Sequence, residues 1–317
     1  MRVEDWEKRT RSRFQEGVCH SCESRNPVKY SKTRCMRSLI PLMTSLLIIL
    51  VTFLNSCTNK KVDYELISTY QDNSIPELDI EVADSTKVLV IMPHADDETV
   101  AGGLIALLKD KGASIHLLTL CEHNDSRVKE LNCAASKLGI EKVEIAGFFN
   151  NTWDDIMEDK ITFWYNNKDS IKKVIARKID DFCPKILITY DHEIGGYGHP
   201  EHRISAELTE RIFNESKDNP EFTPNKIFQI TLSEKLEEFL ISNTPGYELS
   251  IKLTGSKGLP RPDFSVNIKE YWSVKNEAAH CHKSQFNTLK KFYMLYDEKN
   301  KIEHINAFSK EYYRVVE

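Results

Sequence analysis

The chain has 317 residues, of which 40% are hydrophobic and 29% are charged, with 43 basic side chains (Lys and Arg) against 48 acidic ones. These proportions are typical of a folded globular protein and exclude the disordered, collagen-like and multi-span membrane classes. The net charge of -5 provides no basic field for a phosphate backbone, so no nucleic-acid partner is expected.

An uncharged, strongly apolar segment lies near the N-terminus, from Ser38 to Ser56, directly after Arg37. A positive residue, an apolar run and a small residue before a cut are typical of an export signal, and Leu54-Asn55-Ser56-Cys57 resembles a bacterial lipobox. The resemblance implies a lipid on Cys57 and a place in the bacterial cell envelope, membrane-anchored and facing the periplasm or the surface. An uncleaved transmembrane anchor is the alternative, because the segment is nearly long enough to span a bilayer. We therefore expect residues 1–35 to be a misassigned start or a disordered extension, 36–57 a lipoprotein signal peptide, 58–85 a tether and lead-in, and 86–317 one folded domain.

Regular structure is predicted from Lys87 onward, where apolar runs of strand length alternate with segments of helical spacing. The predicted strands are Lys87–Met92, Ser114–Cys121, Lys142–Ala146, Lys185–Tyr190 and Lys226–Leu232. The predicted helices are Thr99–Lys111, Ser126–Leu138, Ser170–Phe182 and His202–Phe213. Strands that are apolar almost throughout, alternating with helices, are typical of a mostly parallel sheet with helices on both faces. The sequence therefore predicts a single-domain α/β fold.

The remaining segments have weaker patterns. Residues 148–169 and 235–263 are expected to form loops over a site, and Ile268 is expected to start one long amphipathic helix that leads to a short C-terminal tail. The eight cysteines are dispersed, so no disulfide framework is expected. Four of them are predicted to be buried free thiols without a role: Cys121, Cys133, Cys183 and Cys281.

Imidazole and carboxylate side chains follow two of the predicted strands. Residues 93–98 (PHADDE) come directly after the first strand, and residues 191–202 (DHEIGGYGHPEH) follow the strand that ends at Tyr190. Ligands of open α/β sheets bind at the carboxyl ends of the strands, so both clusters are expected at the same edge of the sheet. A mixed His and Asp ligand set with an open position suits a catalytic zinc ion. Helix capping by the acids alone would explain Asp96 to Glu98, but neither His94 nor the second cluster.

Both clusters resemble motifs of the LmbE-like (PIG-L) de-N-acetylase family. Residues 93–98 are similar to its Pro-His-x-Asp-Asp-Glu motif, and residues 198–202 (GHPEH) are similar to its second motif. Two weaker similarities are Arg127-x-x-Glu130 and the stretch from Lys275 to His282-x-Ser284-Gln285. The resemblance runs from about Lys87 to about Gln285. It implies a Rossmann-like fold, a zinc ion, and removal of the acetyl group from an N-acetylglucosamine unit.

The resemblance also implies a role for each motif residue. The implied zinc ligands are His94, Asp97 and His202, with Fe2+ or Co2+ as other divalent metals that such a site accepts. Asp96 is the implied general base, and His199 the implied acid or partner of the oxyanion. Two residues are implied in substrate binding, Tyr197 at the carbonyl side and Arg127 at the sugar hydroxyls. Glu201 stands where the family often has Asp, and we expect its longer side chain to change the orientation of His199.

The sequence therefore predicts a zinc-dependent hydrolase of the linear-amide type that acts on an N-acetylated sugar or glycoconjugate. Neither a Gly-x-Ser-x-Gly elbow nor a Gly-x-x-x-x-Gly-Lys phosphate loop is present, which disfavours serine and nucleotide hydrolases. Two alternatives stay open: a non-catalytic glycan-binding lipoprotein on the same fold, and a zinc amidase for another acyl group. Trp153, Trp164 and Tyr165 are expected either to stack on a sugar or to pack in the core.

Overall fold

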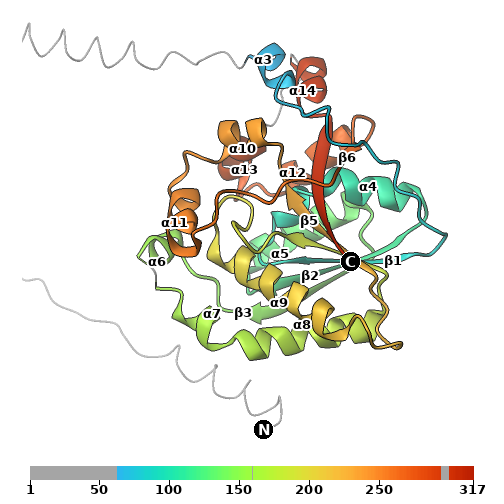
Figure 1. Ribbon diagram of the computed structural model, residues 1–317, viewed down its shortest axis with the longest axis vertical. Coiled ribbons are helices and arrows are strands. Elements are labelled where there is room, and N and C mark those ends of the chain that lie inside the picture. Colours follow the sequence, from blue (N-terminus) through green and yellow to red (C-terminus); the bar gives the residue numbers. More distant parts are fainter. Residues whose placement is uncertain (1–62, 159, 294–299) are drawn as a thin grey trace, which may run out of the picture. The chain divides into compact units, whose positions relative to one another are not determined.

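A seven-stranded sheet organises the residues that the computed structural model describes, 63–158, 160–293 and 300–317 (Figure 1). The strand order is β3-β2-β1-β4-β5-β7-β6. The strands are β1 (Lys87–Met92), β2 (Ser114–Cys121), β3 (Lys142–Phe148), β4 (Ile186–Tyr190), β5 (Lys226–Thr231), β6 (Phe264–Asn267) and β7 (Lys310–Val316). Strands β1 to β5 pair in parallel, whereas β7 pairs antiparallel with β5 and β6. The predicted α/β fold with a mostly parallel sheet is confirmed, while the predicted lipid site Cys57 lies outside the described residues.

The side chains of β1 explain why helices cover both faces of the sheet. Val88, Val90 and Met92 belong to a buried cluster on one face, and Leu89 and Ile91 belong to a cluster on the other. This alternation is the period of two of a β-strand, and because all five side chains are buried, both faces need a cover. On the first face the cover is α4 (Gly102–Asp110), α5 (Asp125–Leu138) and α12 (Trp272–Cys281). On the second face it is α8 (Lys168–Phe182) and α9 (Pro200–Ser216).

The segments that were expected to be loops contain short helices. Residues 148–169 hold α6 (Trp153–Met157) and α7 (Thr162–Asn166), and residues 235–263 overlap α10 (Glu234–Leu240) and hold α11 (Pro245–Thr254). The lead-in before β1 contains α3 (Tyr64–Ser68), whose Ile67 is buried in one cluster with Leu236 and Tyr312. No helix within the described ranges combines the length and the apolar character needed to cross a bilayer.

The C-terminal region differs from the prediction of one long helix and a short tail. After α12 the chain forms α13 (Phe286–Tyr293), α14 (Lys301–Ala307) and the strand β7, which lies between β5 and β6. The predicted helix starts too early, because residues 268–271 form the turn between β6 and α12. The tail was mistaken for an irregular end although residues 310–316 (KEYYRVV) are rich in the aromatic and β-branched residues that strands favour.

A disulfide joins Cys133 of α5 to Cys281 of α12. The prediction of buried free thiols is therefore wrong for this pair, and it is also wrong for Cys183, which is exposed. Only Cys121 is a buried free thiol as expected. The pairing escapes a reading of the sequence because 148 residues separate the two cysteines, and it is the packing of α5 against α12 that brings their Cα atoms to 5.7 Å.

Candidate metal centre

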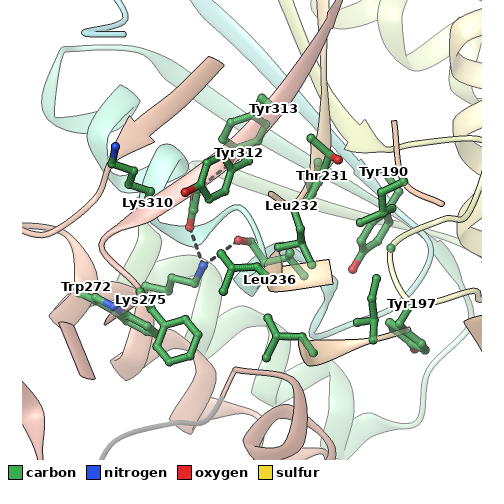
Figure 2. Close-up of a pocket in the computed structure, with 18 residues that line it drawn as sticks. Tyr190, Tyr197, Thr231, Leu232, Leu236, Trp272, Lys275, Lys310, Tyr312 and Tyr313 are labelled. Atoms are coloured by element: carbon green, nitrogen blue, oxygen red, sulfur yellow. Dashed lines mark hydrogen bonds and ion pairs between the residues drawn. The ribbon is translucent and has the colours of Figure 1, made fainter. Parts of the chain in front are cut away.

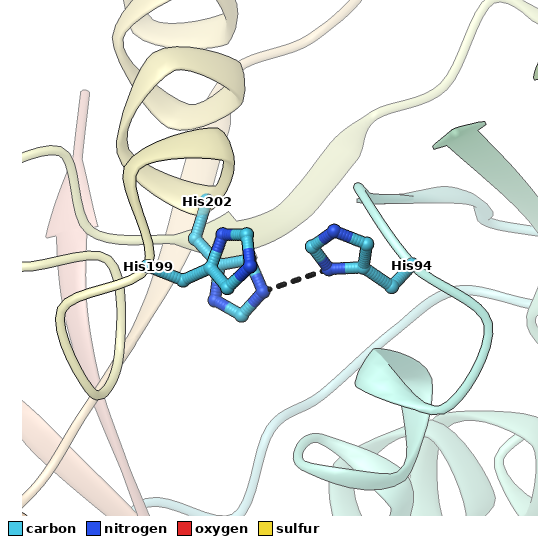
Figure 3. A group of neighbouring side chains, drawn as sticks. All are labelled: His94, His199 and His202. Carbon is cyan, nitrogen blue, oxygen red and sulfur yellow. Dashed lines mark hydrogen bonds between the residues drawn. The ribbon is translucent and has the colours of Figure 1, made fainter. Parts of the chain in front are cut away.

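The two predicted clusters meet where strands β1 and β4 end side by side. Residues 93–96 follow β1, and the loop of residues 191–199 connects β4 to α9. In the order β3-β2-β1-β4-β5 the connections leave in opposite directions from β1 and β4, and ligands of doubly wound sheets bind at this switch point. The fold thus brings His94, from one loop, close to His199 and His202, from the start of α9 (Figure 3).

Donor atoms of three residues converge at this edge of the sheet. His94 Nδ1 lies 3.1 Å from His202 Nε2 and 3.2 Å from Asp97 Oδ2, and His202 Nε2 lies 3.2 Å from Asp97 Oδ1. All three residues are buried. A tetrahedral zinc ion with bonds of about 2.0–2.1 Å holds its ligand atoms about 3.3 Å apart, so the size and chemistry of this triangle fit a small divalent metal. The metal-ligand assignment from the sequence stays a prediction, but its three residues are brought together.

The orientation of each donor is fixed by a neighbour. His202 Nδ1 donates to the carbonyl of Gly195 at 3.0 Å, which turns Nε2 toward the centre. The two oxygens of Asp97 accept hydrogen bonds from the hydroxyl of Tyr190 (3.0 Å) and the backbone N–H of His94 (2.8 Å). Although burial opposes ionisation of Asp97, the adjacent His202 and His94 hold its pKa well below the ordinary value. Asp97 is therefore a carboxylate.

The loop that carries the second cluster is shaped by Asp191, whose role was not recognised in the sequence. Its buried carboxylate accepts hydrogen bonds from four successive backbone N–H groups, those of residues 193–196, at 2.6–3.1 Å. Gly195 has a φ of +70°, and a Cβ there would lie 2.8 Å from the backbone nitrogen of Arg203. Only glycine fits this close turn, which presents the carbonyl that orients His202.

The carboxylate of Glu201 binds His94, whereas its length led us to expect an effect on the orientation of His199. Its Oε2 accepts a hydrogen bond from His94 Nε2 at 2.6 Å, and its Oε1 accepts one from the backbone N–H of Asn151 at 3.1 Å and one from the Asn151 side chain. Burial raises the pKa of Glu201, but the hydrogen bonds from His94 and Asn151 hold it below its usual value. A carboxylate that binds the outer nitrogen of a histidine fixes the ring and makes the inner nitrogen a better metal ligand.

Two other donor sets also include His94: one adds His199 and His202, and the other adds Cys121 and Glu201. Burial raises the pKa of the Cys121 thiol to about 12, and a thiol binds metals only when it is deprotonated. The nitrogen of His94 in the set with Cys121 is also the one that Glu201 already occupies. The triangle of His94, Asp97 and His202 is therefore a better candidate than the set with Cys121.

The carboxylate of Asp96, next to the ligand Asp97 in the sequence, pairs with Arg127. Its Oδ1 lies 3.0 Å from Arg127 Nη2, its backbone N–H donates to Glu98 Oε2 at 3.0 Å, and Arg127 also donates to the Ala95 carbonyl. Burial and the charge of Asp97 raise the pKa of Asp96 to about 7, against the opposing effect of Arg127. Arg127, which was predicted to contact the sugar, thus binds the loop that carries Asp96, the predicted general base.

Support for this loop comes from a buried pair that the sequence only hinted at. His282, at the end of α12, lies with its Nε2 2.5 Å from Glu98 Oε1, and neither residue has exposed surface. Because the other oxygen of Glu98 binds the backbone of Asp96, this pair connects α12 to the position of Asp96.

His199 caps the N-terminus of α9. Its Nδ1 accepts a hydrogen bond from the backbone N–H of Glu201 at 3.3 Å, and its ring stacks on His202 with 4.7 Å between ring centroids. Burial and the neighbouring His94 and His202 hold the pKa of His199 well below its usual value. A neutral ring whose Nδ1 accepts carries its proton on Nε2, so His199 can act as a donor.

Aromatic side chains surround the mouth of the site. Trp153 is 41% exposed, and its ring lies 6.2 Å from His199 and 6.4 Å from Tyr197, while Tyr197 lies 5.2 Å from His202. Trp153, Trp164 and Tyr165 were expected either to stack on a sugar or to pack in the core. Trp164 packs in the core, because it is fully buried and donates to the Phe149 carbonyl at 2.8 Å. Trp153 and Tyr165 are available at the surface instead.

Comparison with known structures concerns the fold alone. The N,N'-diacetylchitobiose deacetylase from Pyrococcus horikoshii aligns with a TM-score of 0.46 and 19% identity over 74% of this chain and 84% of that chain. The 4-carboxy-2-hydroxymuconate hydratase GalB aligns equally well, with a TM-score of 0.46 and 15% identity over 73% of this chain and 96% of that chain.

The sequence comparisons are more specific. Two similar relatives are named 1D-myo-inositol 2-acetamido-2-deoxy-alpha-D-glucopyranoside deacetylase, one from Frankia casuarinae and one from Thermobifida fusca. They are 23% and 26% identical to this chain over 67% and 63% of its length, and the alignments cover 83% of each relative. Residues 89–213 match the family model PIG-L, described as GlcNAc-PI de-N-acetylase. This segment contains every donor of the metal centre, from His94 to His202, and through it the chain is similar to the PIG-L deacetylase family.

Proposed function

We propose that the protein is a metal-dependent deacetylase that hydrolyses the acetamide of N-acetylglucosamine-type substrates, with zinc as its metal. The observation that carries the proposal is the triangle of His94, Asp97 and His202, whose donor atoms lie 3.1–3.2 Å apart in a buried position. The names of the relatives, both deacetylases of an acetamido sugar linked to inositol, support the substrate class.

The residues around the triangle supply what amide hydrolysis needs. A bound zinc ion would polarise the amide carbonyl and make water acidic enough to attack near neutral pH. Asp96 then takes the proton of the attacking water, since Arg127 and Glu98 hold its side chain and backbone beside the centre. The neutral His199 donates from Nε2 to the developing oxyanion or to the leaving nitrogen.

We also propose that the protein is exported and anchored in the bacterial cell envelope by a lipid on Cys57. The Cys133–Cys281 disulfide supports export, because structural disulfides form and persist in oxidising compartments outside the cytosol. An N-terminal transmembrane anchor would serve the same location.

Acetate release from three substrates tests the enzymatic proposal: N-acetylglucosamine, its inositol glycoside and N,N'-diacetylchitobiose. Activity is expected with zinc, lost on chelation and restored by zinc. Asp96→Asn should retain zinc while kcat falls by roughly 10²–10⁴, because only the basic oxygen is lost. Asp97→Ala should lose zinc and activity together, and Asp181→Asn, an exposed change on α8, serves as the matched control. Full turnover by Asp96→Asn, or no stoichiometric divalent metal under any loading condition, would defeat the proposal.

A further inference from the structure

A largely apolar cavity of about 120 Å³ adjoins the metal centre (Figure 2). It lies beyond the ends of β4, β5 and β7, and its walls include Leu232, Leu236, Ile241, Leu259, Trp272 and Phe308. Tyr190 and Tyr197 line both the cavity and the metal centre. Tyr190 donates to the ligand Asp97 and stacks on His202 with 4.1 Å between ring centroids. The cavity and the metal centre therefore share the side chains of Tyr190 and Tyr197 as a common wall.

Two charged groups in the cavity wall, Lys275 and Glu311, pair with each other. Lys275 Nζ lies 2.6 Å from Glu311 Oε1 and donates to the Val100 carbonyl at 2.8 Å, as the dashed lines in Figure 2 show. The Glu311 carboxylate also accepts hydrogen bonds from the backbone of Gly103 and Leu104, both at 2.9 Å.

The hydroxyls in the wall are engaged as well. Thr231 donates to the Pro260 carbonyl at 2.6 Å, and Tyr313 donates to Glu311 at 2.7 Å. A sugar ring placed here would meet these groups already engaged and would lose most of its hydrogen bonds to water, which is unfavourable. The wall instead matches an alkyl or aryl group, which needs no hydrogen-bond partner.

The sheet order decides which part of the substrate reaches the cavity. From a scissile amide the amino sugar extends from the nitrogen and the acyl group from the carbonyl carbon, in opposite directions. The polar groups His123 and Arg127 follow β2 on one side of the centre, whereas the apolar cavity lies on the β5 and β7 side. The polar sugar belongs on the first side, which leaves the acyl group for the second.

We propose that this cavity binds the acyl chain of the substrate, so that the enzyme hydrolyses N-acyl amino sugars with chains longer than acetyl. This proposal rests on the proposed amide hydrolysis and specifies which acyl group the hydrolysed amide carries. The C–N bond breaks, the oxygen of water bonds to the carbonyl carbon, and a proton from water ends on the nitrogen, which gives a fatty acid and a free amino sugar. A 150 Å³ apolar cavity holds a benzene ring, so this one holds on the order of four to six carbons.

Hydrolysis of N-acylglucosamines with acetyl, butanoyl, hexanoyl and decanoyl chains tests the proposal, with the released amine measured by a fluorogenic reagent. Each fully buried methylene should raise kcat/KM about fourfold, so the four extra methylenes of hexanoyl should raise it up to roughly 250-fold over acetyl, with decanoyl falling again. In Leu236→Phe, which fills the cavity, the hexanoyl-to-acetyl ratio should fall at least tenfold. Leu253→Phe, an exposed change on α11, should leave that ratio as in the wild type.

The outcomes separate this inference from the proposed function. No hydrolysis of any chain refutes the amidase itself, whereas hydrolysis of acetyl without a gain for longer chains refutes only the cavity's role. If octyl N-acetylglucosaminide shows the gain instead, and loses it in Leu236→Phe, the cavity binds the aglycone and the proposal is wrong. The wild-type enzyme should also be inhibited by hexanoate but not by acetate at equal concentration. This measurement needs no variant, so it tests the proposal even if Leu236→Phe does not fold.

Discussion

Replacing Glu201 by Gln tests how far a residue outside the metal triangle controls it. Both carboxylate oxygens of Glu201 accept hydrogen bonds, one from His94 and the other from two donors of Asn151. A glutamine has one oxygen and one NH2 group, so in either orientation of the amide an N–H faces another donor. The substitution therefore removes the charge that holds His94 and leaves at least one buried donor without a partner.

The size of the effect follows from these contacts. Loss of the partner that orients a metal-binding histidine weakens metal affinity about 10–100-fold, which is about 1.4–2.7 kcal/mol. The unsatisfied donor should lower the free energy of unfolding by about 1–3 kcal/mol. At saturating zinc, kcat should return close to the wild-type value, because Asp96 and His199 keep their positions.

Zinc affinity measured by competition with a chelating dye, together with the melting temperature and acetate release, tests this expectation. Glu207→Gln is the matched control, since Glu207 is exposed on the same helix and pairs with Lys168. Unchanged zinc affinity in Glu201→Gln, or an equal loss in the control, would show that the contact with His94 does not orient a metal ligand.

Three further predictions concern stability and location. Cys133→Ser should lower the free energy of unfolding by about 2–5 kcal/mol and make it insensitive to reducing agent, as measured by urea denaturation; equal stability of wild type and variant would contradict the disulfide. Burial, with a smaller effect of nearby Lys275, lowers the pKa of His304 from 6.5 to about 4, so the folded state loses stability as pH falls below 6.5. Between pH 6.5 and pH 5 the free energy of unfolding, measured by denaturation, should fall by about 2 kcal/mol more in the wild type than in His304→Gln. Equal falls in the two proteins would show that the pKa of His304 is not lowered. Cys57→Ser should abolish lipidation in native cells, and wild-type protein without lipid on Cys57 by mass spectrometry would exclude the lipoprotein.

The fold was predictable where the pattern is local. Runs such as Lys87–Met92 are apolar throughout because β1 is covered on both faces, and Gly139 ends α5 with a left-handed φ of 73°. Strand β7 was missed although its composition favours a strand, because its partners β5 and β6 lie far from it in the sequence. The disulfide was missed for the same reason.

The candidate site was predictable as a set of residues but not as a network. Two motifs name His94, Asp97 and His202, and the topology of an open sheet explains why they meet. The sequence does not reveal that Glu201 turns back to His94, because that contact depends on the direction in which α9 starts relative to β1. Asn151 and His282 come from other elements, and only packing brings them to the site.

The backbone of Asp96 has a consequence for protein engineering. Its φ of 126° lies in a region that side chains with a Cβ avoid, and such a conformation costs about 1–3 kcal/mol at a non-glycine residue. Glycine adopts it freely, so a library screened only for thermal tolerance should enrich Asp96→Gly, even though that change removes the proposed base. Selection for heat resistance and selection for turnover are therefore expected to diverge at this one position, and an engineered stable variant should be sequenced there before its activity is interpreted.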